Sequence, residues 1–169
     1  MTSERYTHHH RSEVNVAIDV HKLFAYLDDH RLLAGHMEKP SLMMAGATMQ
    51  VETDALKGQA VGSVIRITGR VLGVNLAVDE VVTERSSPSH KTWETRGAPR
   101  LLVIGSYRMG FSIAPQQACS RLVVFIDYQH PQRGFSRVLG LIFGRTYAAW
   151  CTRRMTVDAV AAFADPSAR

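Results

Sequence analysis

The sequence predicts an α+β domain in which one antiparallel sheet is covered by a long C-terminal helix. Residues 43–130 form successive segments with alternating apolar and polar side chains, joined by short connections that favour antiparallel pairing. Residues 133–165 contain no proline and repeat apolar side chains at helical spacing. A shorter helical segment, 17–30, precedes most of the strands. Helices and strands are therefore segregated rather than alternating, which favours α+β over α/β.

The first element is expected to be a strand over residues 8–16, within "YTHHHRSEVNV". Strand geometry sends His8 and His10 to one face and His9 to the other, so at most two of them could face one metal ion. A solvated edge strand, adventitious metal affinity and a metal site are the three interpretations. Because the sequence shows no third ligand, we predict the edge strand and no metal site.

The helix that follows is expected to be capped by Asp19 and to end near residue 30. Its apolar residues Leu23, Phe24 and Leu27 recur at helical spacing and would bury one face. Alternation then predicts strands at 43–51, 63–73, 74–85, 91–97, 101–114 and 121–130. With the first strand these make a sheet of about seven strands. One antiparallel sheet needs a cover on one face, and only the last helix has enough apolar surface to supply it.

Composition is that of one soluble domain spanning residues 1–169, with a core of about 8–163: 46% of residues are hydrophobic and 21% charged. The start of the chain lacks an apolar leader segment, and the two cysteines lie far apart, so we expect a cytoplasmic location. Between Arg96 and Val157 there are nine arginines, no lysine and one acid, Asp127. This charge split indicates either a solvated arginine-rich face or an anionic partner. No nucleic-acid motif accompanies it, so we expect no nucleic-acid partner.

Several segments resemble SRPBCC proteins, the START-like superfamily that includes polyketide cyclase/dehydrase-type members. "VNVAIDVHKLFAYLDDHRLL" is similar to the opening strand and helix of that family. "AVGSVIRITGRVLGVNLAVDEVVTERSSPSHKTWETRG" resembles its central meander, and "GSYRMGFSIAPQQACSRLVVFIDYQHP" resembles its closing hairpin. The chain departs from the family where Ile18, Asp19 and Val20 replace an Ala-Pro dipeptide.

This resemblance covers nearly the whole chain and implies the helix-grip (START-like) fold. In that fold a curved antiparallel sheet wraps around the long C-terminal helix, with a cavity between them. The superfamily shares a cavity rather than a set of catalytic residues, so no catalytic residue is transferred to this chain. Nor does the sequence contain a common catalytic or nucleotide-binding motif, and no cofactor is expected.

The resemblance implies that inward-facing side chains line such a cavity and bind a hydrophobic ligand, although the same residues would also suit a solid core. Tyr107 and Tyr128 stand out because a buried phenol needs a hydrogen-bond partner, which a ligand can supply. Trp93 is placed near the rim by analogy with the family. The complete set of expected ligand-binding residues is Met43, Met49, Ile65, Ile67, Trp93, Tyr107, Met109, Phe111, Tyr128, Leu139, Phe143 and Tyr147.

Two glycines, Gly140 and Gly144, lie one turn apart in the last helix, where each costs about 1 kcal/mol relative to alanine. Contact with the sheet, room for a ligand and a helix–helix dimer seam are the three interpretations, of which sheet contact is preferred. Arg108 is expected to point away from the cavity and to pair with Asp127 across neighbouring strands.

Three functions remain open. The leading hypothesis is the binding of a hydrophobic small molecule or lipid in the cavity. The second is a polyketide cyclase/dehydrase-like enzyme that uses acid–base catalysis, with Tyr107 or Tyr128 as first candidates for the proton donor. The third is a peripheral membrane or partner-docking protein, because "RVLGLIFGRTYAAWCTRR" is apolar with basic ends.

Overall fold

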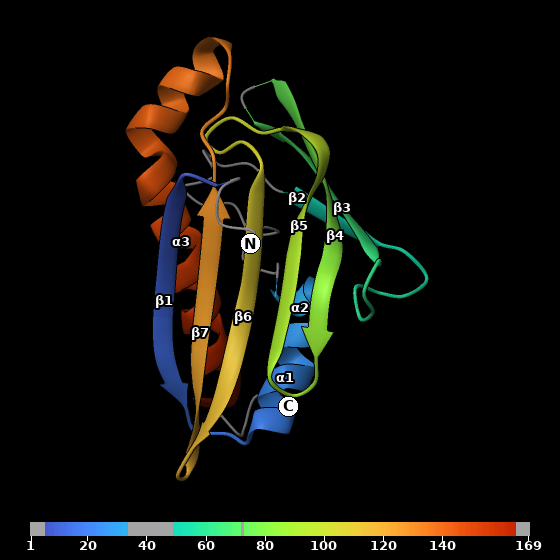
Figure 1. Ribbon diagram of the computed structural model, residues 1–169, viewed down its shortest axis with the longest axis vertical. Helices are drawn as coiled ribbons and strands as arrows, with labels where there is room; N and C mark the ends of the chain where they lie inside the picture. Colours follow the sequence, from blue (N-terminus) through green and yellow to red (C-terminus); the bar gives the residue numbers. More distant parts are fainter. Residues whose placement is uncertain (1–5, 34–48, 72, 165–169) are drawn as a thin grey trace.

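A computed structural model describes residues 6–33, 49–71 and 73–164 of the chain. Seven strands form one antiparallel sheet in the order β1-β7-β6-β5-β4-β3-β2, and the helix α3 packs against β1 and β7 (Figure 1). The strands are β1 His8–Val16, β2 Met49–Thr53, β3 Val64–Val71, β4 Val74–Ser86, β5 His90–Arg100, β6 Tyr107–Gln116 and β7 Cys119–Tyr128. The helices are α1 Val20–Asp28, α2 His30–Leu33 and α3 Gly134–Ala164.

The predicted α+β architecture is confirmed, and so is the single C-terminal helix. The strand expected at 101–114 begins only at Tyr107, because 101–106 are needed to connect β5 to its antiparallel neighbour β6. Conversely, β5 runs to Arg100 rather than ending near residue 97. Only Met49–Thr53 of the strand expected at 43–51 is seen as β2, and residues 43–48 lie outside the described residues.

The first helix starts as expected and ends earlier than expected. The Asp19 carboxylate accepts hydrogen bonds from the backbone N–H groups of His21 and Lys22 at 2.9 and 3.1 Å, which caps α1. Helix α1 stops at Asp28, and the chain restarts as the short helix α2 at His30. This break turns the His30 side chain into the interior, where it is 2% exposed.

A buried ion cluster fixes the end of α1 against the sheet. The Asp28 carboxylate accepts from the Arg85 guanidinium at 2.8 Å and lies 3.1 Å from the Lys91 ammonium nitrogen. The ammonium group also donates to the Asp28 carbonyl oxygen at 2.8 Å. Burial alone would raise the pKa of Asp28, but the hydrogen bond from Arg85 and the charge of Lys91 outweigh it and lower that pKa. The cluster therefore positions α2, which follows immediately.

The long helix packs its small residues against the protein. In α3 the buried positions include Gly140, Gly144 and Ala148. A Cβ atom on Gly140 would lie 2.6 Å from the Pro131 side chain, and one on Gly144 would lie 3.0 Å from the His130 ring. The two glycines thus permit close approach of the β7–α3 connection, and a Cβ atom on Gly144 would also lie 3.5 Å from the Tyr128 ring of β7, which agrees with the preferred interpretation of sheet contact.

Candidate ligand-binding site

The concave face of the sheet carries the side chains that alternation directs toward α3. Cross-strand register aligns Trp93 with Met109 and Met109 with Ile126, so these residues share one face. Tyr107 lies opposite Tyr128 in the same way. Seven of the predicted cavity residues are buried on this face, namely Ile65, Ile67, Trp93, Tyr107, Met109, Phe111 and Tyr128.

A polar cluster interrupts this apolar face. Glu80 of β4 is 2% exposed, and one of its carboxylate oxygens accepts a hydrogen bond from the Tyr107 hydroxyl. Its other oxygen lies 3.1 Å from Nε2 of His30, which donates to it. Three elements that are distant in sequence, α2, β4 and β6, thus supply one buried hydrogen-bonded network, which we call the Glu80 cluster.

The Glu80 cluster leaves one buried polar atom without a partner. Within the described part of the chain, Nδ1 of His30 is the buried side-chain nitrogen or oxygen that has no hydrogen bond. The Trp93 ring packs edge-on against the His30 imidazole with centroids 4.8 Å apart, which holds the imidazole in place. An unsatisfied buried nitrogen carries a desolvation cost that a ligand hydroxyl or amide would relieve.

Burial and charge keep the nearby phenols and thiol protonated. Burial, reinforced by the Glu80 carboxylate, raises the pKa of Tyr107 well above its ordinary value. On α3, burial likewise raises the pKa of Tyr147 and raises that of the Cys151 thiol to about 12. The Tyr147 hydroxyl bonds the Cys151 sulfur one helical turn further on. All three groups are therefore neutral hydrogen-bonding groups near pH 7.

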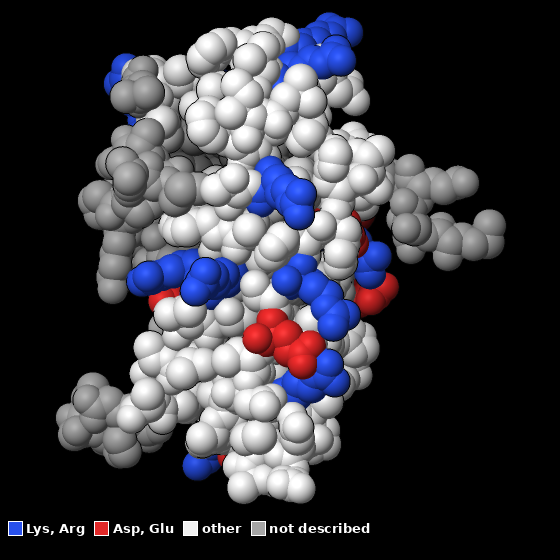
Figure 2. Space-filling model, turned by 90° about the vertical axis from the view of Figure 1, so that its left-hand side faces the viewer, with Lys and Arg blue, Asp and Glu red and all other residues white. Residues whose placement is uncertain are grey.

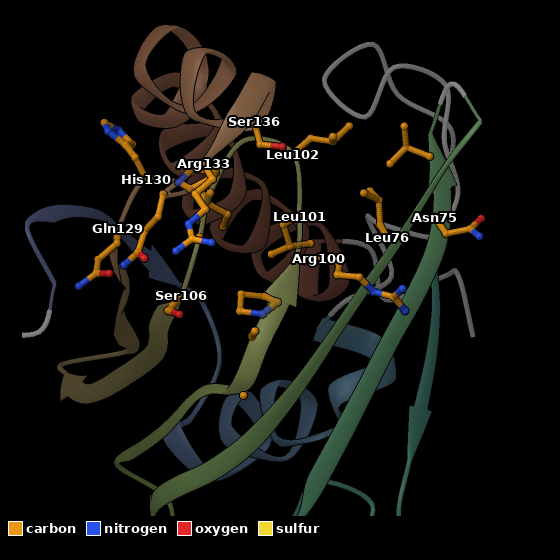
Figure 3. A pocket seen from close by; sticks show the side chains of 18 residues that line it. Asn75, Leu76, Arg100, Leu101, Leu102, Ser106, Gln129, His130, Arg133 and Ser136 are labelled. Atoms are coloured by element: carbon orange, nitrogen blue, oxygen red, sulfur yellow. The ribbon is translucent and has the colours of Figure 1, made fainter.

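A pocket of about 640 Å³ opens at the end of the sheet where the connections β3–β4, β5–β6 and β7–α3 meet (Figure 3). Leu76, Leu101 and Leu102 supply part of its apolar lining, and the side chains of Arg100 and Arg133 lie at the same opening. Leu76 and Glu80 lie four positions apart on β4, which corresponds to about 13 Å along the strand. The pocket thus opens at one end of the face on which the Glu80 cluster lies.

The remaining predicted residues are placed differently. Met43 lies outside the described residues, and Met49 is buried in β2. Leu139, Phe143 and Tyr147 are four residues apart along α3 and so lie on one side of it. Phe143 is not buried, contrary to its predicted place in the interior, since it is 49% exposed. The buried face of this part of α3 is taken by glycines instead. Within the described part of the chain, none of the ligand-binding residues predicted from the sequence is among the residues that line the pocket.

Two residues of the Glu80 cluster, Glu80 itself and His30, are not among those predicted from the sequence. Glu80 had a detectable signal, because it lies between Val78 and Val82 on the inward stripe of β4, where an acid is unexpected. His30 carried no comparable signal, since its inward direction follows from the break between α1 and α2. Trp93, expected at the cavity rim, is instead 2% exposed beside this cluster.

The three N-terminal histidines divide between the two faces of β1 as predicted. His9 faces outward and lies 2.5 Å from the Asp127 carboxylate, whereas His10 faces α3 and bonds the Thr152 hydroxyl at 2.9 Å. Asp127 is thus paired with histidine, and the predicted pairing with Arg108 is wrong, because the Arg108 guanidinium lies over the Phe125 ring. No group of three metal-binding side chains occurs among the described residues.

The seven-stranded antiparallel sheet, with the long C-terminal helix packed on it and a pocket at one end, is a helix-grip fold. Solved structures with that fold are similar to the chain. A protein from Chromobacterium violaceum has a TM-score of 0.63 at 14% identity, covering 93% of this chain and 97% of that one. An aromatase/cyclase from Streptomyces sp. R1128 has a TM-score of 0.60 at 15% identity, covering 92% and 90%.

Norcoclaurine synthase from Thalictrum flavum is similar to the same extent, with a TM-score of 0.61 at 14% identity, covering 93% of this chain and 86% of that one. Neither a protein-family model nor a curated protein matches the sequence. At such low identity these likenesses establish the helix-grip fold that the sequence resemblance implied, and nothing beyond the fold.

Proposed function

We propose that the chain binds a hydrophobic or amphipathic small molecule, or a lipid, between the concave face of the sheet and α3. The observation that carries the proposal is the pocket of about 640 Å³ at the open end of that face. Pockets for small ligands commonly measure about 300–1,000 Å³ and combine apolar walls with a few polar groups. Leu76, Leu101 and Leu102 line this pocket and are expected to contact the ligand, whereas the described residues among those predicted from the sequence lie outside its lining.

The Glu80 cluster supports an amphipathic ligand over a purely apolar one. Glu80 and His30 are buried polar groups at the apolar face, and His30 Nδ1 has no partner within the described part of the chain. A ligand hydroxyl or amide group that reached that nitrogen would satisfy it, whereas protein already covers Trp93 and Met109. The ligand is therefore expected to carry its polar group at one end.

A dye-binding assay tests the proposal. The protein, extracted to remove retained lipid, is titrated with the apolar fluorophore Nile red, and native mass spectrometry of unextracted protein checks for a retained ligand. Leu101→Trp should block the half-buried mouth and weaken dye binding by at least about tenfold, whereas Val61→Trp at an exposed loop position should not. Equal dye binding by both variants, or none by the wild type, would contradict the proposal.

A second candidate function, acid–base catalysis of the polyketide cyclase/dehydrase kind, is favoured by the Glu80 cluster. A carboxylate and an imidazole 3.1 Å apart are suited to exchanging a proton with a bound substrate. The similar fold of an aromatase/cyclase is compatible with this function. Tyr107 is a less suitable proton donor than the sequence suggested, because its hydroxyl is already bonded to Glu80 and burial raises its pKa.

The catalytic candidate predicts that Glu80→Gln abolishes turnover of a poly-β-carbonyl substrate while Nile red binding persists. Glu84→Gln is the matched control, since it makes the same change at an exposed position of the same strand. Unchanged turnover in Glu80→Gln would exclude Glu80 as the reacting group. Dye binding without any turnover by the wild type would leave ligand binding as the function of the site.

A further inference from the structure

The N-terminal half of α3 has an unusual distribution of side chains. Its buried positions are the small residues Gly140, Gly144 and Ala148, whereas its large apolar side chains face solvent. The exposed set, which we call the α3 apolar face, consists of Phe135 (73% exposed), Val138 (50%), Leu141 (63%) and Ile142 (61%). A surface helix normally shows the opposite pattern, with large apolar residues inward.

These side chains form a continuous surface rather than isolated exposures. Phe135, Val138 and Ile142 are spaced by three and four residues, which aligns them along one side of the helix. Leu141 adjoins Val138 and Ile142 on the same turn. Contiguous exposed apolar surface of this kind is typical of interaction sites, and a single scattered leucine is not.

The charge around the α3 apolar face is of one sign. No aspartate or glutamate occurs from residue 128 to residue 157. Arg133, Arg137 and Arg145 are exposed and have no ion-pair partner among the described residues. Figure 2 shows this side of the molecule: the upper part, where the N-terminal half of α3 lies, carries basic side chains and no acidic ones.

An apolar helix face flanked by arginines is complementary to an anionic lipid surface. Phenylalanine and aliphatic side chains enter the interface between headgroups and acyl chains, and the arginines remain at the level of the headgroups. An anionic leaflet attracts each such cation. No helix within the described residues could span a membrane, so the chain would lie on the surface.

The pocket lies beside this face. Arg133 and Ser136 line the pocket, and Phe135, between them in sequence, is the most exposed residue of the α3 apolar face. The exposed Val74 and the half-buried Leu102 add apolar side chains from the other two connections at the same end. A surface bound to the α3 apolar face would therefore be adjacent to the pocket mouth.

We infer that the N-terminal half of α3 docks onto an anionic membrane surface. The inference goes beyond the proposed ligand binding and does not depend on it. Docking brings the pocket mouth to the bilayer, which is where apolar ligands are dissolved.

Vesicle co-sedimentation of the full chain tests the inference. Binding is expected to phosphatidylcholine vesicles that contain about a third phosphatidylserine, but not to pure phosphatidylcholine, and it should weaken as salt rises toward about 0.15 M. Phe135→Ser/Ile142→Ser should weaken binding at least about tenfold. Leu56→Ser/Val61→Ser, which removes two comparably exposed apolar side chains from the 54–62 loop, is the matched control and should bind as wild type.

The charge contribution is tested separately. Arg137→Gln/Arg145→Gln should weaken binding at low salt by about 30-fold, and the control Arg31→Gln/Arg70→Gln, also at exposed positions, should have a much smaller effect. Circular dichroism of each variant confirms that the fold is kept. Equal effects of target and control pairs, or equal binding to neutral vesicles, would overturn the inference.

Three other outcomes are also decisive. If the wild type does not bind vesicles and light scattering shows a dimer that Phe135→Ser/Ile142→Ser converts to monomer, the face binds a second copy and the inference is wrong. If vesicles do not bind but Nile red does, docking fails while the proposed ligand binding stands. Salt-sensitive vesicle binding without Nile red binding would support docking and contradict the proposed function.

Discussion

Tyr107→Phe provides the most direct test of the Glu80 cluster. The substitution removes only the hydroxyl that donates to the Glu80 carboxylate, at a side chain that is 6% exposed. A hydrogen bond to a charged group contributes roughly 1.5–3 kcal/mol, and its loss leaves a buried carboxylate oxygen unsatisfied. We therefore expect the free energy of unfolding to fall by about 2 kcal/mol. For a chain of this length that corresponds to a melting temperature lower by about 4–8 °C.

Tyr128→Phe is the matched control. Tyr128 pairs with Tyr107 across neighbouring strands and is 2% exposed, but its hydroxyl has no hydrogen bond within the described ranges. Its loss should change the free energy of unfolding by less than about 0.5 kcal/mol. Urea denaturation followed by circular dichroism measures both values. Equal destabilisation by the two substitutions would refute the conclusion that the Tyr107–Glu80 bond stabilises the fold.

A double-mutant cycle with Glu80→Gln assigns the energy to the pair. An amide can still accept from the Tyr107 hydroxyl, but without the charge. The coupling energy between Tyr107→Phe and Glu80→Gln should therefore be about 0.5–1.5 kcal/mol rather than zero. Additive effects would mean that the Tyr107 hydroxyl contributes equally whether the group at position 80 is a carboxylate or an amide.

Three further predictions concern other parts of the molecule. Because hydrogen bonds and nearby charges lower the pKa of Asp28, the stabilising effect of its ionised carboxylate is present at neutral pH and is lost as the pH falls below about 4. Asp28→Asn should therefore lower the urea midpoint at pH 7 and make the free energy of unfolding fall less steeply as the pH is lowered. Gly140→Ala should destabilise the protein by about 1–3 kcal/mol in thermal unfolding, because the added methyl group clashes with the Pro131 side chain although alanine favours the helix. Ala161→Gly, at an exposed position of the same helix, measures the effect of helix propensity alone. With a pKa of about 12, only about one Cys151 thiol in 10⁴ is thiolate at pH 8, so Cys151 should resist alkylation by iodoacetamide. Mass spectrometry should find alkylation first at the half-buried Cys119. Similar alkylation rates at the two cysteines would contradict the burial of Cys151.

Local sequence patterns were sufficient for the elements and their faces. Alternation in 107–113 is a property of consecutive residues, and it predicted correctly that Tyr107, Met109 and Phe111 share one buried face. Helical periodicity without proline likewise predicted one long C-terminal helix. These patterns hold because strand and helix periods depend on backbone geometry alone.

Contacts between distant segments were decided only by the tertiary structure. The end of α1 depends on Asp28 meeting Arg85 and Lys91, which are more than fifty residues away in sequence. That meeting turns His30 toward Glu80, and no local pattern records it. The sequence likewise could not predict that the large apolar side chains in the first half of α3 face outward. Periodicity identifies an apolar stripe on a helix, but the segments that pack against the helix decide whether its glycines or its large apolar side chains are buried.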